Sequence, residues 1–114
     1  MKETVKIFKA LSDPNRIRIV KLLEIQPLCV CEITSILGLA TSTVSKHLSI
    51  LKESGFIFEQ KEGKWVNYHL NRATRQSTIR ELLSLISKTD LDDSTIRTDQ
   101  EKVRSVNRAT LCKG

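Results

Sequence analysis

The stretch TSTVSKHLSILKESG, from Thr41 to Gly55, decides how the rest of the chain is interpreted. Val44, Leu48 and Leu51 recur at helical spacing, so a helix here turns one apolar stripe toward a core. The opposite face carries short hydroxyl and basic side chains, and the stretch has no acid before Glu53. Ordinary solvated helix faces are often composed in the same way. The neighbouring segments therefore decide between a solvated face and a binding face.

The segment before this stretch gives the helix its context. Residues 28–37, LCVCEITSIL, have apolar side chains at helical spacing, and Gly38 is well placed to end a helix. After the short joint Gly38-Leu39-Ala40, Thr41 is a predicted N-cap. A helix, a short glycine-containing turn and a second helix form the outline of a helix-turn-helix. The second helix of that motif enters the major groove, where Ser, Thr and Lys reach base edges and phosphates.

Two β-prone runs follow, at residues 56–60 and 65–70, separated by Lys61-Glu62-Gly63-Lys64. This pattern predicts a hairpin with a four-residue turn and with Lys61 and Lys64 at its tip. A hairpin in this place makes the helix-turn-helix a winged one. Trp65 and Tyr68 can stack on a nucleic acid or pack the hairpin against the helices. Packing is favoured because an isolated hairpin is only marginally stable.

Helices are also predicted on both sides of this motif. Residues 3–11 have Val5, Phe8 and Leu11 at helical spacing, and Asp13-Pro14 supplies the N-cap and first position of a second helix that ends at Gln26-Pro27. Residues 72–88 form the last strongly periodic helix, which with the first is the expected dimer seam. We therefore expect a mainly α fold with a β-hairpin wing. Residues 1–88 would be the winged helix-turn-helix DNA-binding and dimerisation domain.

Residues 89–114 are expected to form a polar C-terminal tail. Thr98 and Glu101 have capping-box spacing, which allows a short helix around residues 99–109. The rest of this tail is expected to be mobile, as chain termini tend to be.

Charge and composition limit the possible partners. Lys and Arg outnumber the acids 19 to 13, the net charge is +6 and the pI is about 9.5. This excess favours an anionic partner, with nucleic acid ahead of a membrane because no strongly basic amphipathic helix is evident. The sequence has no long apolar run and no signal-peptide pattern, which predicts a cytoplasmic protein without a membrane partner.

Cys29 and Cys31 lie at the start of the first predicted helix of the motif. Two thiols at this spacing do not share one face of a regular helix, but they can converge on one ion in the extended geometry of a helix start. A helix N-terminus also lowers a thiol's pKa, which favours the metal-binding thiolate. The alternatives are two small core side chains, a redox switch and a zinc site, which lacks four suitable ligands. A thiol enzyme is disfavoured because no general base stands beside either cysteine in the sequence.

Three segments carry a resemblance to a known family: residues 11–23 (LSDPNRIRIVKLL), 28–33 (LCVCEI) and 42–55 (STVSKHLSILKESG). Together they resemble the ArsR/SmtB family of metal-responsive winged-helix repressors. The resemblance implies a homodimer that binds double-stranded operator DNA and leaves it when a metal ion occupies a cysteine or histidine site. The side chains then expected to contact DNA are Thr41, Ser42, Thr43, Ser45, Lys46, His47, Lys61 and Lys64.

LCVCEI resembles the arsenic-sensing branch of that family, which implies Cys29 and Cys31 as ligands of an As(III) or Sb(III) inducer and no permanently bound cofactor. The third cysteine of the arsenic-sensing prototype is replaced here by Thr34, so the third ligand is either absent or Cys112. A cadmium- and lead-sensing branch shares the CVC segment but adds N-terminal cysteines that this chain lacks. The histidines that zinc and nickel sensors place on the last helix are also missing. The expected function is a repressor released by As(III) or Sb(III), and the alternative is a winged-helix repressor that senses oxidants or Cd/Pb.

Overall fold

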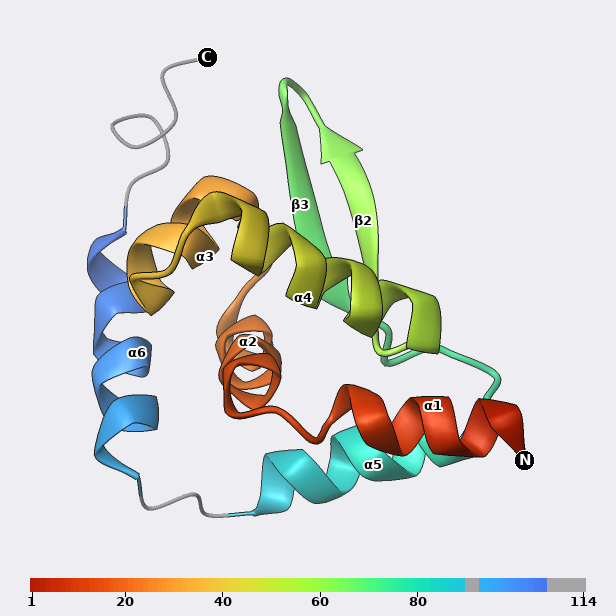
Figure 1. Cartoon of the computed structure of the whole chain (residues 1–114). Coiled ribbons are helices and arrows are strands. Elements are labelled where there is room, and N and C mark those ends of the chain that lie inside the picture. The colour runs from red at the N-terminus through yellow and green to blue at the C-terminus, as the bar shows by residue number, and fades with distance from the viewer. Residues whose placement is uncertain (90–92, 107–114) are drawn as a thin grey trace.

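The computed structural model describes residues 1–89 and 93–106. Along these residues the elements are α1 (Lys2–Ala10), α2 (Pro14–Ile25), β1 (Leu28–Cys29), α3 (Val30–Leu37), α4 (Thr41–Ser54), β2 (Ile57–Glu62), β3 (Trp65–Leu70), α5 (Ser77–Lys88) and α6 (Ser94–Ser105). Figure 1 shows α2 in the middle of the other helices, with the β2–β3 hairpin projecting from the helical body. This arrangement confirms the expected mainly α, winged helix-turn-helix fold.

The central helix, α2, is set by its two ends. Asp13 Oδ1 accepts hydrogen bonds from the backbone N–H groups of Asn15 (2.8 Å) and Arg16 (3.3 Å), and Pro14 occupies the first helical position. Gln26, which precedes a proline, is extended with φ −164° and ψ 158°. Between these ends α2 contributes fully or almost fully buried side chains to the core: Ile19, Val20, Leu22 and Leu23. The other helices pack around this apolar surface.

The helix-turn-helix consists of α3 and α4, joined at Gly38. Gly38 adopts φ +69° and donates its N–H to the carbonyl of Thr34 at 2.9 Å, which ends α3. The apolar stripe of α4 is buried as expected, with Val44, Leu48 and Leu51 at most 1% exposed. The N-cap prediction was wrong by one residue, because Ala40 takes the N-cap position and Thr41 is already helical.

The wing has a tighter turn than the sequence suggested. Strands β2 and β3 pair antiparallel from Ile57 with Leu70 to Glu62 with Trp65, so only Gly63 and Lys64 form the turn. A two-residue hairpin turn needs a positive φ, which Gly63 supplies at +64°. Tyr68 packs against the core, as the packing interpretation predicted for the hairpin. Lys61 lies within β2, opposite Val66, instead of in the turn.

Residues 28 and 29 are not helical, which corrects the prediction of one helix over 28–37. Leu28 pairs with Tyr68 and Cys29 with Asn67, so β1 is the third strand of a sheet in the order β1-β3-β2. Leu28 and Cys29 thus belong to the sheet of the wing, although the Cys29 N–H donates to the side chain of Glu32 in α3. Cys29 therefore sits where the sheet passes into α3.

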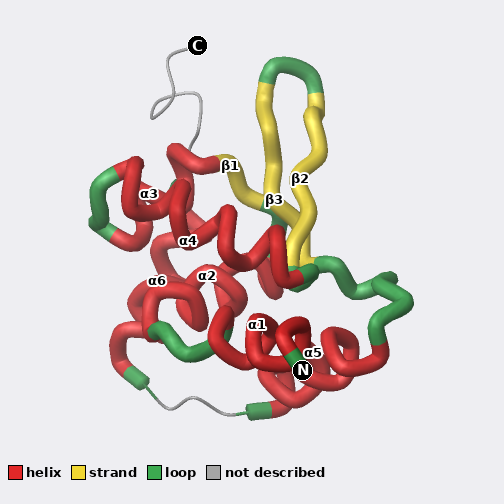
Figure 2. Tube along the Cα trace, turned by 45° about the vertical axis from the view of Figure 1, so that its right-hand side comes forward, coloured by secondary structure: helices red, strands yellow, loops and turns green. Residues whose placement is uncertain are grey.

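Helices α1 and α5 lie side by side on the opposite part of the molecule from the wing tip (Figures 1 and 2). Helix α1 buries Ile7 and Ala10, whereas Phe8 is 53% exposed and Val5 is 42% exposed. Helix α5 begins at Ser77, later than predicted, and leaves Leu85 60% exposed. Both helices of the expected dimer seam thus carry exposed apolar side chains in the single chain.

The described part of the tail forms α6 and packs on the domain. Asp93, not Thr98, caps this helix by accepting hydrogen bonds from the N–H groups of Thr95 (2.8 Å) and Ile96 (3.2 Å). Ile96 and Val103 are buried, and α6 contacts α2 and α3. The helix start was mispredicted because both Asp93 and Thr98 are good N-caps and only packing chooses between them. The domain boundary at residue 88 remains a prediction, and Cys112 lies outside the described residues.

Candidate nucleic-acid interface and thiol site

The N-terminal half of α4 presents the exposed row of side chains that the sequence predicted. The exposed members are Thr41, Ser42, Thr43, Ser45 and Lys46. They lie away from the buried stripe, at the end of α4 where unpaired N–H groups and the helix dipole favour anions. Hydroxyls can donate to or accept from base edges, and Lys46 can pair with a phosphate. This face has the chemistry needed to read and hold a nucleic acid.

His47 does not belong to this exposed row. It is half-buried, and its Nδ1 lies 3.2 Å from a terminal guanidinium nitrogen of Arg16 in α2. The prediction that His47 contacts DNA stays a prediction. The sequence analysis missed Arg16, because its partner lies 31 residues further along the chain.

An exposed ion pair joins the wing to α4, and a ring stack joins the two strands of the wing. Lys52 at the end of α4 forms an ion pair with Glu59 of β2, and this pairing raises the pKa of the Lys52 ammonium group. Phe58 and His69 stack with ring centroids 5.0 Å apart. The predicted DNA contacts Lys61 and Lys64 are both exposed. Both lysines thus lie on the exposed surface of the hairpin that follows α4.

Lys64 also lies against the wing's own aromatic residue. Its Nζ is 5.1 Å from the ring centroid of Trp65, within the range of a cation–π contact.

Cys29 is the N-cap residue of α3 and is almost completely buried, with 4% exposure. Its backbone is extended (φ −88°, ψ 168°), and its N–H donates to Oε1 of Glu32 at 2.9 Å. Glu32 is itself only 6% exposed. This is the geometry of a capping box with cysteine in the place of Ser or Thr. The sequence analysis missed Glu32, although the Cys-x-x-Glu spacing was the signal that could have identified it.

The environment of Cys29 corrects the expected acidity of the thiol. Burial raises the pKa of the Cys29 thiol above its ordinary value of 9.0. The backbone N–H of Glu32 acts in the opposite direction, and the Glu32 carboxylate adds to the rise. The expectation that the helix N-terminus lowers this pKa was wrong, because desolvation outweighs the helix-terminus effect. Cys29 is a protonated thiol at neutral pH.

Cys31 lies in the first turn of α3 and is half-buried. One turn later, Thr34 Oγ1 is buried and has no hydrogen-bond partner among the described residues. Within residues 1–89 and 93–106, no group of three or more His, Cys, Asp or Glu side chains is placed to hold a metal ion. His69 is instead 2.8 Å from Glu62 in the wing. Cys29 and Cys31 lie two residues apart at the start of α3, and Cys29 is a free, buried thiol.

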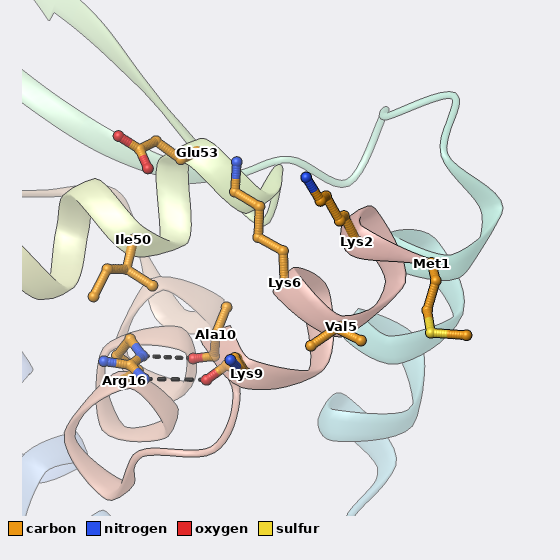
Figure 3. A pocket seen from close by; sticks show the side chains of 9 residues that line it. All are labelled: Met1, Lys2, Val5, Lys6, Lys9, Ala10, Arg16, Ile50 and Glu53. Carbon is orange, nitrogen blue, oxygen red and sulfur yellow. Dashed lines mark hydrogen bonds between the residues drawn. The ribbon is translucent and has the colours of Figure 1, made fainter.

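An open cavity of about 690 Å³ lies between α1 and the C-terminal half of α4 (Figure 3). Its walls combine apolar and cationic side chains with one acid: Met1, Lys2, Val5, Lys6, Lys9, Ala10, Arg16, Ile50 and Glu53. Arg16 lies beside the end of α1 in this view, with its hydrogen bonds to the carbonyls of Lys9 and Ala10 drawn as dashed lines. The cavity includes Val5 and is therefore continuous with the uncovered apolar surface of α1.

A buried helical core, a hydroxyl-rich basic helix as the second helix of the motif and an adjoining hairpin together define a winged helix-turn-helix DNA-binding protein. Residues 13–58 match the family described as "Bacterial regulatory protein, arsR family". The chain is also 34% identical over 105 residues to the arsenical resistance operon repressor of Escherichia coli (strain K12), a match covering 91% of this chain and 81% of that protein. The chain belongs to the arsR family of bacterial transcriptional regulators, which are DNA-binding proteins rather than enzymes.

Other relatives are named for resistance to a different metal or carry no metal in their names. The chain is 43% identical over 70 residues to a cadmium resistance transcriptional regulatory protein CadC homolog of Staphylococcus aureus, covering 60% of this chain and 58% of that protein. Among solved structures it resembles HlyU from Vibrio cholerae N16961, with 28% identity, a TM-score of 0.63, and 76% and 90% of the two chains covered. No helix in the described part of the chain is both long and apolar enough to cross a membrane.

Proposed function

We propose that this protein is a metalloid-responsive repressor that binds operator DNA as a homodimer and is released when As(III) or Sb(III) binds its cysteines. The observation that supports this most is the position of Cys29. The same residue caps α3, pairs with the wing through Asn67 and bonds to Glu32. A ligand that moves the Cys29 sulfur acts on both parts of the DNA-binding surface.

The dimer is proposed from the uncovered apolar surface of α1 and α5. Val5 and Phe8 on α1 and Leu85 on α5 are exposed apolar side chains, and a contiguous exposed apolar surface marks an interaction site. A second copy that covers this surface brings two recognition helices into successive major grooves, about 34–36 Å apart. Repressors of this kind bind near-palindromic operators because the protein has two-fold symmetry.

DNA contact is proposed for the exposed end of α4 and for the wing. The α4 residues that would contact base edges and phosphates are Thr41, Ser42, Thr43, Ser45, Lys46 and His47. Lys61 and Lys64 would follow the neighbouring backbone. The net charge of +6 supports this assignment, because neutralising phosphates supplies most of the non-specific affinity.

The proposed inducer ligands are Cys29 and Cys31, with Cys112 as the third. Trivalent arsenic and antimony bind sulfur strongly, and each thiol proton leaves as water with a hydroxyl group of the metalloid. Cys29 must leave its buried position beside Glu32 to take part, which disturbs the capping box and the pairing with β3. An inducer that prefers this disturbed dimer weakens DNA binding by the same factor, as linkage requires.

The length of the chain after α6 supports Cys112 as the third ligand. Val106 packs against the core, and Lys102 Nζ lies 3.5 Å from the carbonyl of Ile36 in α3. The six residues that follow Val106, up to and including Cys112, span at most about 20 Å when fully extended. Helix α3 is only about 12 Å long. Cys112 of the same or of the partner subunit is therefore the proposed source of a third sulfur.

The test is a mobility shift of the operator complex titrated with arsenite under anaerobic, reducing conditions. We expect the wild type to be released, and the Cys29→Ser/Cys31→Ser double variant to stay bound at the same concentration. Cys112→Ser is expected to require more arsenite and to bind less metalloid per subunit. Equal release of the double variant and the wild type would show that the cysteine pair is not the sensor.

The cadmium-resistance relative supports one alternative signal, a soft divalent ion. Parallel titrations with Cd²⁺ and with peroxide separate the alternatives from the main proposal. Release by Cd²⁺ at lower concentration than by arsenite would favour the divalent ion. Release by peroxide alone would favour an oxidant sensor.

A further inference from the structure

One arginine connects the recognition helix to the helix at the dimer surface. Arg16 donates through Nε to the carbonyl of Ala10 at 2.7 Å and through a terminal nitrogen to the carbonyl of Lys9 at 3.1 Å. Its other terminal nitrogen lies 3.2 Å from Nδ1 of His47 in α4. All three guanidinium nitrogens are thus directed at α1 or α4, each through one contact.

The contact with His47 favours one tautomer of the neutral imidazole. A guanidinium has no acceptor and stays protonated in proteins. The ring nitrogen that faces it must therefore accept the hydrogen bond, which leaves the proton of the neutral ring on Nε2. A ring with a proton on Nδ1 would place two donors against each other.

The contacts with α1 fix the position of Arg16. The last carbonyls of a helix have no partner within the helix, and a cation at that end also interacts favourably with the dipole. Ala10 is completely buried, so its carbonyl depends on a protein donor. The backbone of Arg16 is held in turn by the Asp13 cap of α2. Contacts with α1 and the backbone of α2 therefore hold the guanidinium in place where it contacts His47 of α4.

We propose that Arg16 is a positioning residue for DNA recognition, which holds His47 as the Nε2–H tautomer and ties α4 to the C-terminal end of α1. This inference rests on the proposed role of α4 as the DNA-reading helix. Its consequence is that the placement of the recognition helix depends on the packing of α1, the helix with the uncovered apolar surface. Covering that surface and aligning the reading helix are then coupled in part through Arg16, in addition to the direct packing of α1 on α4.

The first test measures the imidazole directly and needs no DNA. In a ¹⁵N-labelled wild-type protein, the His47 ring is expected to give the Nε2–H pattern, with Nδ1 as the unprotonated nitrogen. In Arg16→Met, which removes every donor, both tautomers are expected. A wild-type ring protonated on Nδ1, or one unaffected by Arg16→Met, overturns the proposal.

The second test measures operator affinity in a double-mutant cycle. Arg16→Met is expected to weaken binding about tenfold, the ratio that corresponds to about 1.4 kcal/mol. Arg16→Lys should recover only part of the loss, since one ammonium cannot reproduce the fork. His47→Gln should add little to Arg16→Met, whereas changes at independent sites would add fully. His47→Asn, whose amide oxygen lies near the position of Nδ1, should cost less than His47→Gln.

Arg75→Met is the matched control, because it removes an exposed arginine from the loop before α5. Equal operator affinities of Arg16→Met and Arg75→Met overturn the proposal, as does full additivity of the changes at positions 16 and 47. Arg16→Lys keeps the test valid if Arg16→Met fails to fold. Failure of the wild type to bind any operator is a different result, which contradicts the proposed function and leaves the tautomer measurement standing by itself.

Discussion

Arg18 of α2 and Asp99 of α6 form a bidentate ion pair between residues 81 positions apart in the sequence. The two contacts are Nε to Oδ2 at 2.8 Å and a terminal nitrogen to Oδ1 at 2.9 Å. Asp99 is only 2% exposed, although it belongs to a largely polar helix. The pair raises the pKa of the Arg18 guanidinium, with the hydrogen bonds to Asp99 as the main cause. It fastens the C-terminal helix to the centre of the domain.

Removing the acid from this pair should destabilise the fold. Asp99→Ala leaves the half-buried guanidinium of Arg18 without its partner, and breaking a buried pair in this way costs about 3 kcal/mol. Urea denaturation followed by circular dichroism measures the change. Glu101→Ala, at an exposed position on the same helix, is the control and should change stability by less than about 0.5 kcal/mol. Equal effects of the two substitutions would mean that the pair contributes nothing.

The raised pKa of Cys29 predicts a pH dependence of stability on the alkaline side. The folded protein favours the neutral thiol, so it holds the proton more tightly than the unfolded chain does. The resulting stabilisation is complete below the ordinary pKa of 9.0 and is lost as the pH rises through the higher folded value. Stability measured from pH 7 to pH 10.5 should therefore fall more steeply in the wild type than in Cys29→Ala. Comparing the two curves removes the contribution of Tyr68, whose pKa burial also raises.

The elements that follow from local chemistry could be predicted from the sequence. Asp13-Pro14 fixes the start of α2, and Gly55 ends α4 with φ +99°. The buried stripe of α4 follows from its apolar spacing. These signals act within a few residues of one another, so no knowledge of the tertiary fold is needed to interpret them.

The features that were missed depend on partners distant in sequence. Cys29 is a strand residue only because β3 lies beside it, and its thiol is weakly acidic only because the fold buries it. The Arg16 contact with His47 spans 31 residues and has no local pattern. Asp99 belongs to a segment that composition assigns to a polar tail. In each case the structure around the residue depends on tertiary packing, which the local sequence pattern does not predict.

The apolar surface on α1 predicts a specific effect on oligomeric state. Phe8→Glu places a charge in the middle of the proposed seam and should convert the dimer into monomers at micromolar concentration, because a buried unpaired charge is strongly unfavourable. Sedimentation velocity measures the change. Val66→Glu, at a wing position that is 40% exposed, is the control and should leave the mass unchanged. A dimer that persists in Phe8→Glu would place the seam elsewhere.

The lysine on the recognition helix should contribute through phosphate contact. Lys46→Gln is expected to weaken operator and non-specific DNA alike. It should also reduce the slope of log K against log salt by about 0.9 per lost phosphate contact, or about 1.8 for a dimer. Fluorescence anisotropy at several salt concentrations gives this slope. Lys88→Gln, at the far end of α5, should leave it unchanged. An unchanged slope in Lys46→Gln would remove Lys46 from the interface.

Gly38 tests whether the turn between α3 and α4 depends on backbone conformation alone. Nothing lies within 4 Å of the position that a Cβ would occupy, so a substitution meets no steric contact. The φ of +69° remains unfavourable for other residues, and Gly38→Ala should cost about 1–2 kcal/mol in urea denaturation. Gly38→Asn should cost less, because asparagine tolerates the left-handed region better. Ser35→Ala, at an exposed position within α3, is the matched control. Equal stabilities of the alanine and asparagine variants would show that the left-handed conformation at Gly38 is not what limits this turn.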